Sequence, residues 1–244
     1  MQMYIDYFAL KELPFSIAPN PQYLYMSGQH QEALAHLLFG IQSEVGGFIL
    51  LTGEVGTGKT TLCRCLLEQI PTDVETAFVL NPKVSAIELL QTISDEFGFA
   101  GEESQSLKTL TDALNHYLIK EHKAGRRAVL IIDEAQNLSR EVLEQLRLLT
   151  NLETNERKLL QIILLGQPEL GETLKKRSLR QFSQRITARY HLEALKSNET
   201  RDYIAHRLKV AGGDSNLFDT KASHRIHQLT GGVPRLINLI CDRS

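Results

Sequence analysis

Short runs of apolar residues alternate with amphipathic stretches over the first four fifths of the chain. The run at 128–132 contains no polar residue, which is typical of a strand covered on both faces. Strands are predicted at 48–52, 75–80, 128–132 and 159–165, with a short fifth at 189–192. Apolar residues spaced by three and four predict helices at 29–44, 61–69, 86–97, 107–122 and 140–152. Strands alternating with helices predict a five-stranded parallel sheet flanked by helices, an α/β fold.

The two ends of the chain follow different patterns. Residues 1–30 carry three prolines and six aromatic residues, and we expect an irregular arm packed on the core, because disordered segments are poor in aromatics. Beyond residue 196 only helices are predicted, at 198–211, 219–229 and from 233 onward. The predicted parts are therefore an arm at 1–30, a core at 31–195, and a small helical domain at 196–244 that we expect to be truncated.

The most informative stretch is Gly53–Thr60, which fits the phosphate-loop pattern G-x-x-x-x-G-K-[ST] between a predicted strand and a predicted helix. Its glycines let backbone N–H groups face a β-phosphate, and the helix N-terminus adds partial positive charge. We expect Lys59 to reach the β- and γ-phosphates and the Thr60 hydroxyl to ligate Mg²⁺. The flanks disfavour the alternative of a glycine-rich turn with a surface lysine. The expected nucleotide-binding residues here are Gly53, Glu54, Val55, Gly56, Thr57, Gly58, Lys59, Thr60 and Thr61.

Asp133 and Glu134 follow the predicted strand at 128–132 directly. In open α/β sheets ligands lie at the carboxyl ends of the strands. Asp133 is therefore expected to hold the Mg²⁺ ion with its water shell, and Glu134 to orient or polarise the attacking water. The alternative is a strand-terminal Asp that caps the following turn.

Asn81 and Gln167 end neighbouring predicted strands at the same edge. Each side chain is a candidate to hydrogen-bond Glu134, the water or the γ-phosphate. Each is followed by proline, and Asn-Pro and Gln-Pro also favour turns, so an ordinary turn role stays open.

Two arginines stand out by position. Arg185 lies between the fourth and fifth predicted strands, and Arg235 begins a helix after Thr230–Pro234. A guanidinium on the γ-phosphate promotes nucleotide hydrolysis, often from a neighbouring subunit. A solvated surface role is the default for any single arginine.

Composition narrows the class of protein. The 244 residues are 42% hydrophobic and 23% charged, with a net charge of −2, which gives no global attraction to nucleic acid or anionic membrane. No apolar run approaches the ~18 residues of a membrane span, and no signal peptide is evident. Three cysteines make no disulfide framework, so we expect a cytoplasmic location.

Several motifs together resemble a known family. The phosphate loop, Asp133-Glu134 and residues 231–235 look like those of an AAA+ ATPase. More specific matches are Tyr7–Leu10 with Pro14-Phe15, Leu24–Ala35 around His30, Ile131–Leu138, and Leu165–Leu170. Over essentially the whole chain these segments resemble ATPases of the general secretion pathway protein A type, with relatives in mannose-sensitive pilus and exopolysaccharide export systems.

This resemblance implies a Mg-dependent, ATP-hydrolysing AAA+ protein with a helical lid, which forms a homo-oligomer and serves the assembly of an envelope secretion or pilus machine. It implies sensor 1 at Gln167, although the wider superfamily more often has Asn or Thr there. It implies the arginine finger, acting in trans, at Arg185, sensor 2 at Arg235 and the polar switch residue at Asn81. Full-length secretion members continue into a membrane helix and a periplasmic wall-binding region, so membrane contact is implied only through parts absent here. The chain is then cytoplasmic, or the cytoplasmic part of an inner-membrane protein.

Two other hypotheses stay open. A DNA-associated ATPase of the transposition target-selector type has a similar core, and the basic cluster at 175–189 keeps it in view. The net charge and the lack of a DNA-reading motif make nucleic acid an unfavoured partner. A nucleotide-binding scaffold that does not hydrolyse is the third, and Glu134 counts against it.

Overall fold

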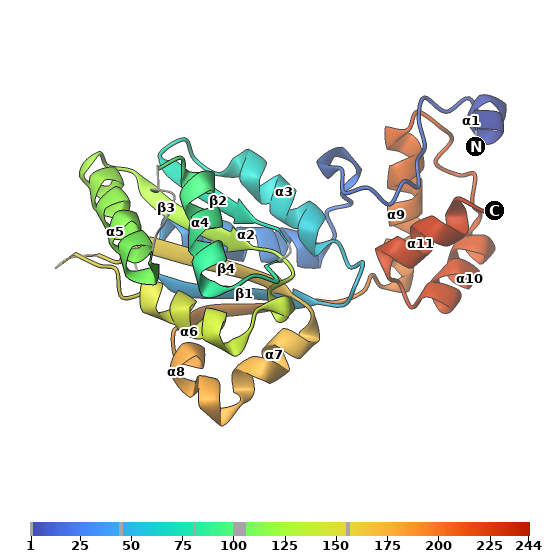
Figure 1. The fold of residues 1–244 in the computed structure, drawn as a ribbon. Coiled ribbons are helices and arrows are strands. Elements are labelled where there is room, and N and C mark those ends of the chain that lie inside the picture. The colour runs from blue at the N-terminus through green and yellow to red at the C-terminus, as the bar shows by residue number, and fades with distance from the viewer. Residues whose placement is uncertain (1, 44–45, 81, 100–105, 155–156) are drawn as a thin grey trace. The chain divides into compact units, whose positions relative to one another are not determined.

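Five parallel strands form one sheet in the order β2-β3-β4-β1-β5 (Figure 1). β5 lies at the edge beside β1, where the Thr187 hydroxyl donates to the Phe48 carbonyl near the start of both strands. The strands are β1 (Gly47–Gly53), β2 (Val74–Val79), β3 (Arg127–Ile132), β4 (Leu160–Gly166) and β5 (Ile186–Leu192). The predicted five-stranded parallel sheet flanked by helices is thus confirmed.

The computed structural model describes residues 2–43, 46–80, 82–99, 106–154 and 157–244. The chain divides into two compact units. The sheet unit comprises residues 33–52 and 69–191, and the loop unit comprises residues 1–32, 53–68 and 192–244. Neither unit is a continuous piece of sequence. Two unit boundaries, at 32/33 and 191/192, lie close to the predicted ones near residues 30 and 195, and residues 53–68, predicted as part of the core, group with the two ends of the chain.

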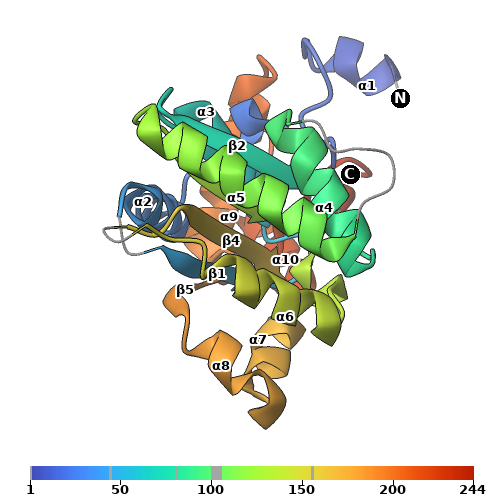
Figure 2. The same cartoon turned by 60° about the vertical axis from the view of Figure 1, so that its left-hand side comes forward.

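Helices cover both faces of the sheet because alternate side chains of a strand point to opposite faces. On one face α4 and α5 lie side by side over β2 and β3 (Figure 2). On the other face α2 packs closely on β1, where a Cβ on Gly40 would lie 2.1 Å from Cδ1 of Ile49. The helices of the sheet unit are α2 (Gly28–Gln42, from residue 33 onward), α4 (Ala86–Phe97), α5 (Leu107–Lys123), α6 (Arg140–Leu149), α7 (Pro168–Lys175) and α8 (Arg180–Ser183).

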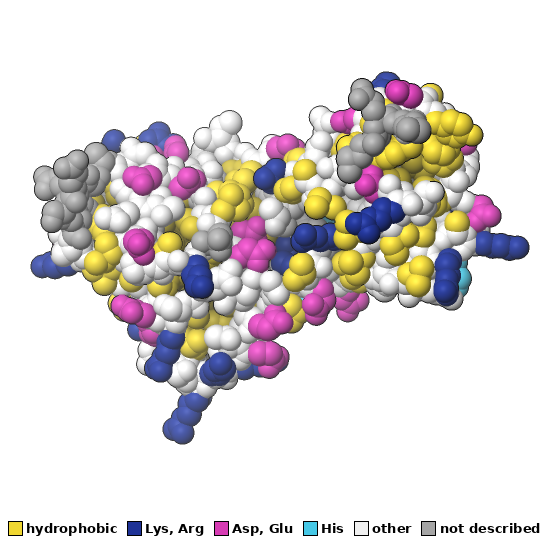
Figure 3. Space-filling view, turned by 45° about the vertical axis from the view of Figure 1, so that its right-hand side comes forward, with side chains coloured by type: hydrophobic (Ala, Val, Ile, Leu, Met, Phe, Trp, Pro, Cys, Tyr) yellow, Lys and Arg dark blue, Asp and Glu magenta, His cyan; other side chains and the backbone are white. Residues whose placement is uncertain are grey.

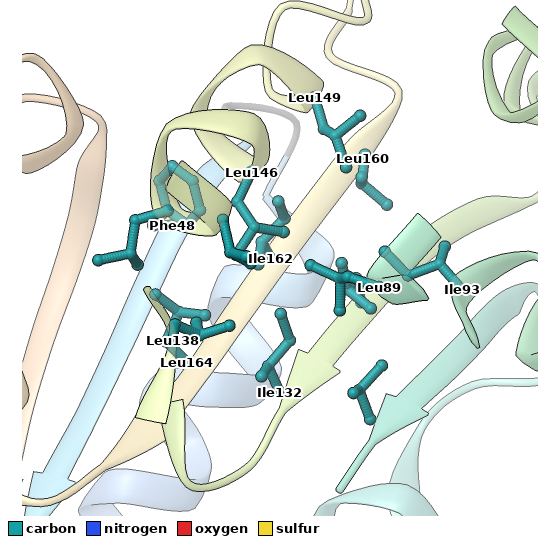
Figure 4. Close-up of a cluster of buried hydrophobic side chains, with 14 of the residues drawn as sticks. Phe48, Leu89, Ile93, Ile132, Leu138, Leu146, Leu149, Leu160, Ile162 and Leu164 are labelled. Carbon is teal, nitrogen blue, oxygen red and sulfur yellow. The ribbon is translucent and has the colours of Figure 1, made fainter. Parts of the chain in front are cut away.

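The contact of α6 with β4 illustrates the core. Leu146 and Leu149 of α6 point at Ile162 and Leu160 of β4 (Figure 4), and none of the four side chains is more than 1% exposed. Burying a leucine or isoleucine side chain stabilises the fold by about 1.5–3 kcal/mol. The strand ends that carry polar residues are therefore held on a well-packed base.

The loop unit contains the C-terminal helices and the N-terminal arm. Its elements are α1 (Gln2–Tyr7), η1 (Pro21–Tyr23), α3 (Lys59–Gln69), α9 (Ser197–Val210), α10 (Thr220–Thr230) and α11 (Pro234–Cys241). Between α1 and α2 the arm has only the single turn η1, and its Phe15 and Tyr23 side chains are buried. Apart from α1 at its start and η1, the arm is irregular and carries buried side chains, and the predicted division into arm, core and helical domain stays a prediction.

One buried cation fastens the arm to α9. Arg207, only 6% exposed, donates from Nε to the Pro14 carbonyl and from Nη2 to the Ser16 carbonyl at 3.0 Å. Its Nη1 donates to the Tyr203 hydroxyl at 3.0 Å, and its guanidinium lies 4.7 Å from the centre of the Tyr23 ring. These contacts fix residues 14–23 against the C-terminal helices.

Most predicted elements match within a few residues, and Ser85 with Glu88 forms the predicted capping box of α4. α6 ends at Leu149, three residues before the predicted end, and β5 begins at Ile186, three residues before its predicted start. α7 and α8 were not predicted. No helix among the described residues is both long and apolar enough to cross a membrane.

Candidate functional site

The phosphate loop leaves β1 and enters α3, as the sequence predicts. Gly56 and Gly58 have φ values of +84° and +102°, a region of backbone conformation that residues other than glycine rarely adopt. Thr57 is fully buried, and its hydroxyl donates to the Glu54 carbonyl at 2.9 Å. The Thr57 N–H donates to the same carbonyl at 3.3 Å, so the loop closes on itself at Glu54.

Lys59 is held inside this loop. Its side chain is 7% exposed, and Nζ donates to the carbonyls of Gly53 at 2.7 Å and Glu54 at 2.9 Å. The ammonium group thus lies over the loop, where an incoming phosphate can exchange with the carbonyls as its partner. Thr60 and Thr61 follow in the first turn of α3.

The first turn of α11 packs on the loop. The Arg235 backbone N–H donates to the Gly56 carbonyl at 3.2 Å, and a Cβ on Gly56 would lie 2.5 Å from that of Arg235. Gly56 is thus required for close approach as well as for its φ value. The Arg235 side chain is exposed. The structure brings Arg235 to the phosphate loop, and its predicted role as sensor 2 stays a prediction.

His30 lies beneath the loop, and only the family resemblance pointed to it beforehand. Its ring is 2% exposed, with Nδ1 2.7 Å from the Ser27 hydroxyl and Nε2 3.3 Å from the Thr57 carbonyl. Because a carbonyl only accepts, Nε2 carries the proton and Nδ1 accepts from Ser27. Burial lowers the pKa of His30, which favours this neutral form. The arm thus contributes a buried hydrogen bond to the loop backbone.

A second group of polar residues lies at the carboxyl edge of the sheet unit. Asp133, 2% exposed, directly follows β3, and its Oδ1 accepts the Glu134 N–H at 2.8 Å. Glu134 has φ +54°, a left-handed conformation that is uncommon for a residue with a side chain. This backbone turn separates the directions of two adjacent carboxylates.

Gln136 and Gln167 surround the Glu134 carboxylate. Gln136 Nε2 donates to Glu134 Oε2, and Gln167 Nε2 lies 3.5 Å from the same oxygen. The backbone N–H of Gln167 donates to Gln136 Oε1 at 3.1 Å. Gln136 was missed from the sequence, where only its distance of two residues from Glu134 pointed to it. Asn81 lies outside the described residues.

Arg185 lies at the opposite end of the strands of the same sheet, where β1 begins. Its carbonyl accepts the Phe48 N–H at the start of β1, at 2.9 Å. Its Nη1 donates to the Thr150 hydroxyl at 2.6 Å and to the Arg147 carbonyl at 3.1 Å, so it caps the C-terminus of α6. The half-buried side chain therefore has a structural partner besides its predicted catalytic one.

The donors predicted for Mg²⁺ suit that ion. Mg²⁺ binds proteins through one or two oxygen donors and keeps waters and substrate phosphates as its other ligands. Thr60 and Asp133 are such donors. Among the described residues no three His, Cys, Asp or Glu side chains cluster into a metal site made by protein alone.

Comparisons with known proteins agree with this description. The family model described as "AAA domain" matches residues 42–174. The chain is 55% identical, over 99% of its length, to general secretion pathway protein A of Aeromonas hydrophila, and covers 44% of that relative. It thus spans less than half of that protein.

Two solved structures share the fold. The ORC2 protein of Aeropyrum pernix (ADPNP-ADP complexes) superimposes with a TM-score of 0.71 at 18% identity, covering 95% of this chain and 65% of that one. Cdc6p of Pyrobaculum aerophilum gives a TM-score of 0.73 at 17% identity, with 95% and 64% covered. Identities this low establish the fold alone.

Proposed function

Because the chain belongs to the AAA domain family, we propose that it binds Mg-ATP, hydrolyses it as a homo-oligomer, and drives or regulates assembly of an envelope secretion machine. The observation that carries the proposal is the phosphate loop, with Gly56 and Gly58 in the left-handed region and Lys59 held over the loop carbonyls. A loop of this form at a helix N-terminus is an anion site. In this proposal each residue of the nucleotide, metal and catalytic sites has the role expected for it from the sequence.

Binding would proceed by exchange at Lys59. The ammonium group gives up the Gly53 and Glu54 carbonyls and pairs with the β- and γ-phosphates, while the loop N–H groups hold the phosphate oxygens. Thr60 and Asp133 would hold Mg²⁺, which when bound neutralises charge that develops on the phosphates. Arg235 would move together with the loop when nucleotide binds, because its backbone N–H donates to the Gly56 carbonyl.

Hydrolysis would depend on Glu134. Its carboxylate orients the attacking water and accepts its proton, the task of a general base. Gln167 Nε2 lies 3.5 Å from a Glu134 carboxylate oxygen, so Gln167 would sense a displacement of that carboxylate. A scaffold without turnover would not require this arrangement.

The proposed partners follow from the relative's name. General secretion pathway protein A serves secretion by that name, and 55% identity supports an analogous role here, at the cytoplasmic side of the envelope. The DNA-binding alternative has less support. Lys175 pairs with Glu172, Arg185 caps α6, and basic and acidic side chains are interspersed on the face drawn in Figure 3. A duplex affinity that falls steeply with salt would revive it.

Calorimetry with Lys59→Met tests the proposal. Because Lys59 is 7% exposed, Met retains the buried stem and removes only the ammonium group. We expect the parent to bind ATP in the presence of Mg²⁺ and to release phosphate, and Lys59→Met to lose binding by about 100-fold or more, the effect of one buried charge-assisted contact. Lys209→Met, an exposed lysine of α9, is the matched control and should bind as the parent does. Near-normal affinity in Lys59→Met would refute the assignment.

A further inference from the structure

The single turn after β3 holds a side chain that touches both Glu134 and the end of β4. η2 (Ala135–Asn137) packs against β4 and α7. It is anchored by Ala135, which is fully buried, and by Leu138, which is 7% exposed. The backbone that carries Gln136 is therefore rigid.

The hydrogen bonds of Gln136 fix which way its amide faces. The Gln167 backbone N–H is a donor, so the oxygen of the Gln136 amide must face it. The amide nitrogen then faces Glu134, where a carboxylate accepts. Both ends of the amide thus meet the complementary group, and a flipped amide would lose both bonds.

Space for this bridge is provided by Gly166, the last residue of β4. A Cβ there would lie 3.1 Å from Gln136 Oε1 and 2.7 Å from Cδ2 of Leu170. Any larger residue would press on the amide. The end of β4 is thus shaped to admit Gln136.

We propose that Gln136 is a positioning residue, which holds the Glu134 carboxylate through Oε2 and ties it to the main chain at Gln167. Glu134 has a left-handed backbone and needs a fixed side chain to place its other oxygen on the water. A displacement of about 1 Å at a reacting group costs up to ~100-fold in rate. The inference rests on the proposed function, since it concerns the hydrolytic step.

The test compares Gln136→Met with the parent. Met keeps length and volume but cannot donate. We expect kcat to fall by about 10- to 100-fold, with KM for ATP and the affinity for ADP within about twofold of the parental values. Gln145→Met, the same change at a buried α6 glutamine, is the matched control and should keep the parental kcat.

A double-mutant cycle separates positioning from a structural role. In a Glu134→Gln background, followed by single-turnover hydrolysis of labelled ATP, Gln136→Met should lower the rate no further, because the carboxylate it holds is gone. Equal losses in both backgrounds, or weaker ADP binding with lower thermal stability, would overturn the proposal, and so would parental kcat in Gln136→Met.

A second variant guards against misfolding of the first. Gln136→Glu keeps the acceptor for the Gln167 N–H and replaces the donor by a like charge, so its kcat should fall at least as far. Parental kcat in this variant would also overturn the proposal. An inactive parent would instead count against the proposed function.

Discussion

Arg185 and Glu134 lie at opposite ends of the strands of one sheet, and their separation leads to a prediction about which subunit Arg185 serves. Arg185 stands beside the start of β1, whereas Glu134 follows the end of β3. A strand of six or seven residues spans about 20 Å at ~3.3 Å per residue. An arginine side chain of six bonds reaches about 7 Å. Within one chain the two groups cannot meet at one γ-phosphate, so an Arg185 that acts on a γ-phosphate would have to act at the site of a neighbouring subunit.

Replacing Arg185 by Ala has two effects that must be separated. It removes the cap on α6 as well as the predicted finger. Two lost hydrogen bonds cost about 1–3 kcal/mol of stability, a tolerable part of the 5–15 kcal/mol typical of a domain. A lost arginine finger lowers kcat about 10³- to 10⁵-fold, which is about 4–7 kcal/mol of barrier.

Thr150→Val distinguishes these effects. It removes the hydroxyl that holds Arg185 and leaves the guanidinium in place. We expect Thr150→Val to resemble Arg185→Ala in thermal stability but to retain phosphate release close to the parental rate. Equal loss of activity in the two variants would assign Arg185 to structure alone.

Mixing completes the assay. Lys59→Met and Arg185→Ala should each be inactive. In an equal mixture about a quarter of interfaces unite an intact loop with an intact arginine, so about a quarter of the parental activity per subunit should return if assembly is random. No recovery from two preparations that both assemble would refute a role in trans.

Two further outcomes are expected. Glu134→Gln should bind Mg-ATP with parental affinity in calorimetry while turnover falls by ~100-fold or more, because Gln cannot accept the proton; parental turnover would contradict this. Arg207→Met should remove the guanidinium hydrogen bonds to the carbonyls of Pro14 and Ser16, the second of which keeps the Asn238 amide as a donor at 3.3 Å, at a cost of about 3 kcal/mol. The Lys11 amide, which bonds the Ala211 carbonyl, should then exchange its hydrogen ~100-fold faster, with the exposed Arg201→Met as control. Unchanged protection at Lys11 would show that Arg207 does not hold the arm.

Local chemistry explains what the sequence could predict. Three features depend only on residues that are close in sequence, so the sequence predicts them: the glycines of the phosphate loop, the capping box at Ser85 and the apolar run of β3. α7 and α8 are short and are stabilised by burial of Leu170, Leu174 and Phe182 rather than by a long periodic pattern.

The missing parts of the site depend on contacts distant in sequence. Gln136 meets the backbone of Gln167, 31 residues away, and His30 meets Thr57, 27 residues away. The cap that Arg185 makes on Thr150 is of the same kind. No spacing rule links such pairs, because the sheet and the packed helices decide which strand ends meet.

The phosphate loop has neighbours from both ends of the chain, and this has a consequence for biosynthesis. The loop rests on His30 before it and on Val233 and Arg235 far behind it. Because α11 follows the loop and all five strands in the sequence, a ribosome releases the loop and the strands before α11 emerges, so the nascent loop must wait for its last support while the strands can already pair. A fragment limited to residues 42–174 would carry the whole phosphate-loop signature and none of these three supports. A fragment that contains the phosphate-loop sequence therefore lacks the contacts that hold the loop in the conformation described here.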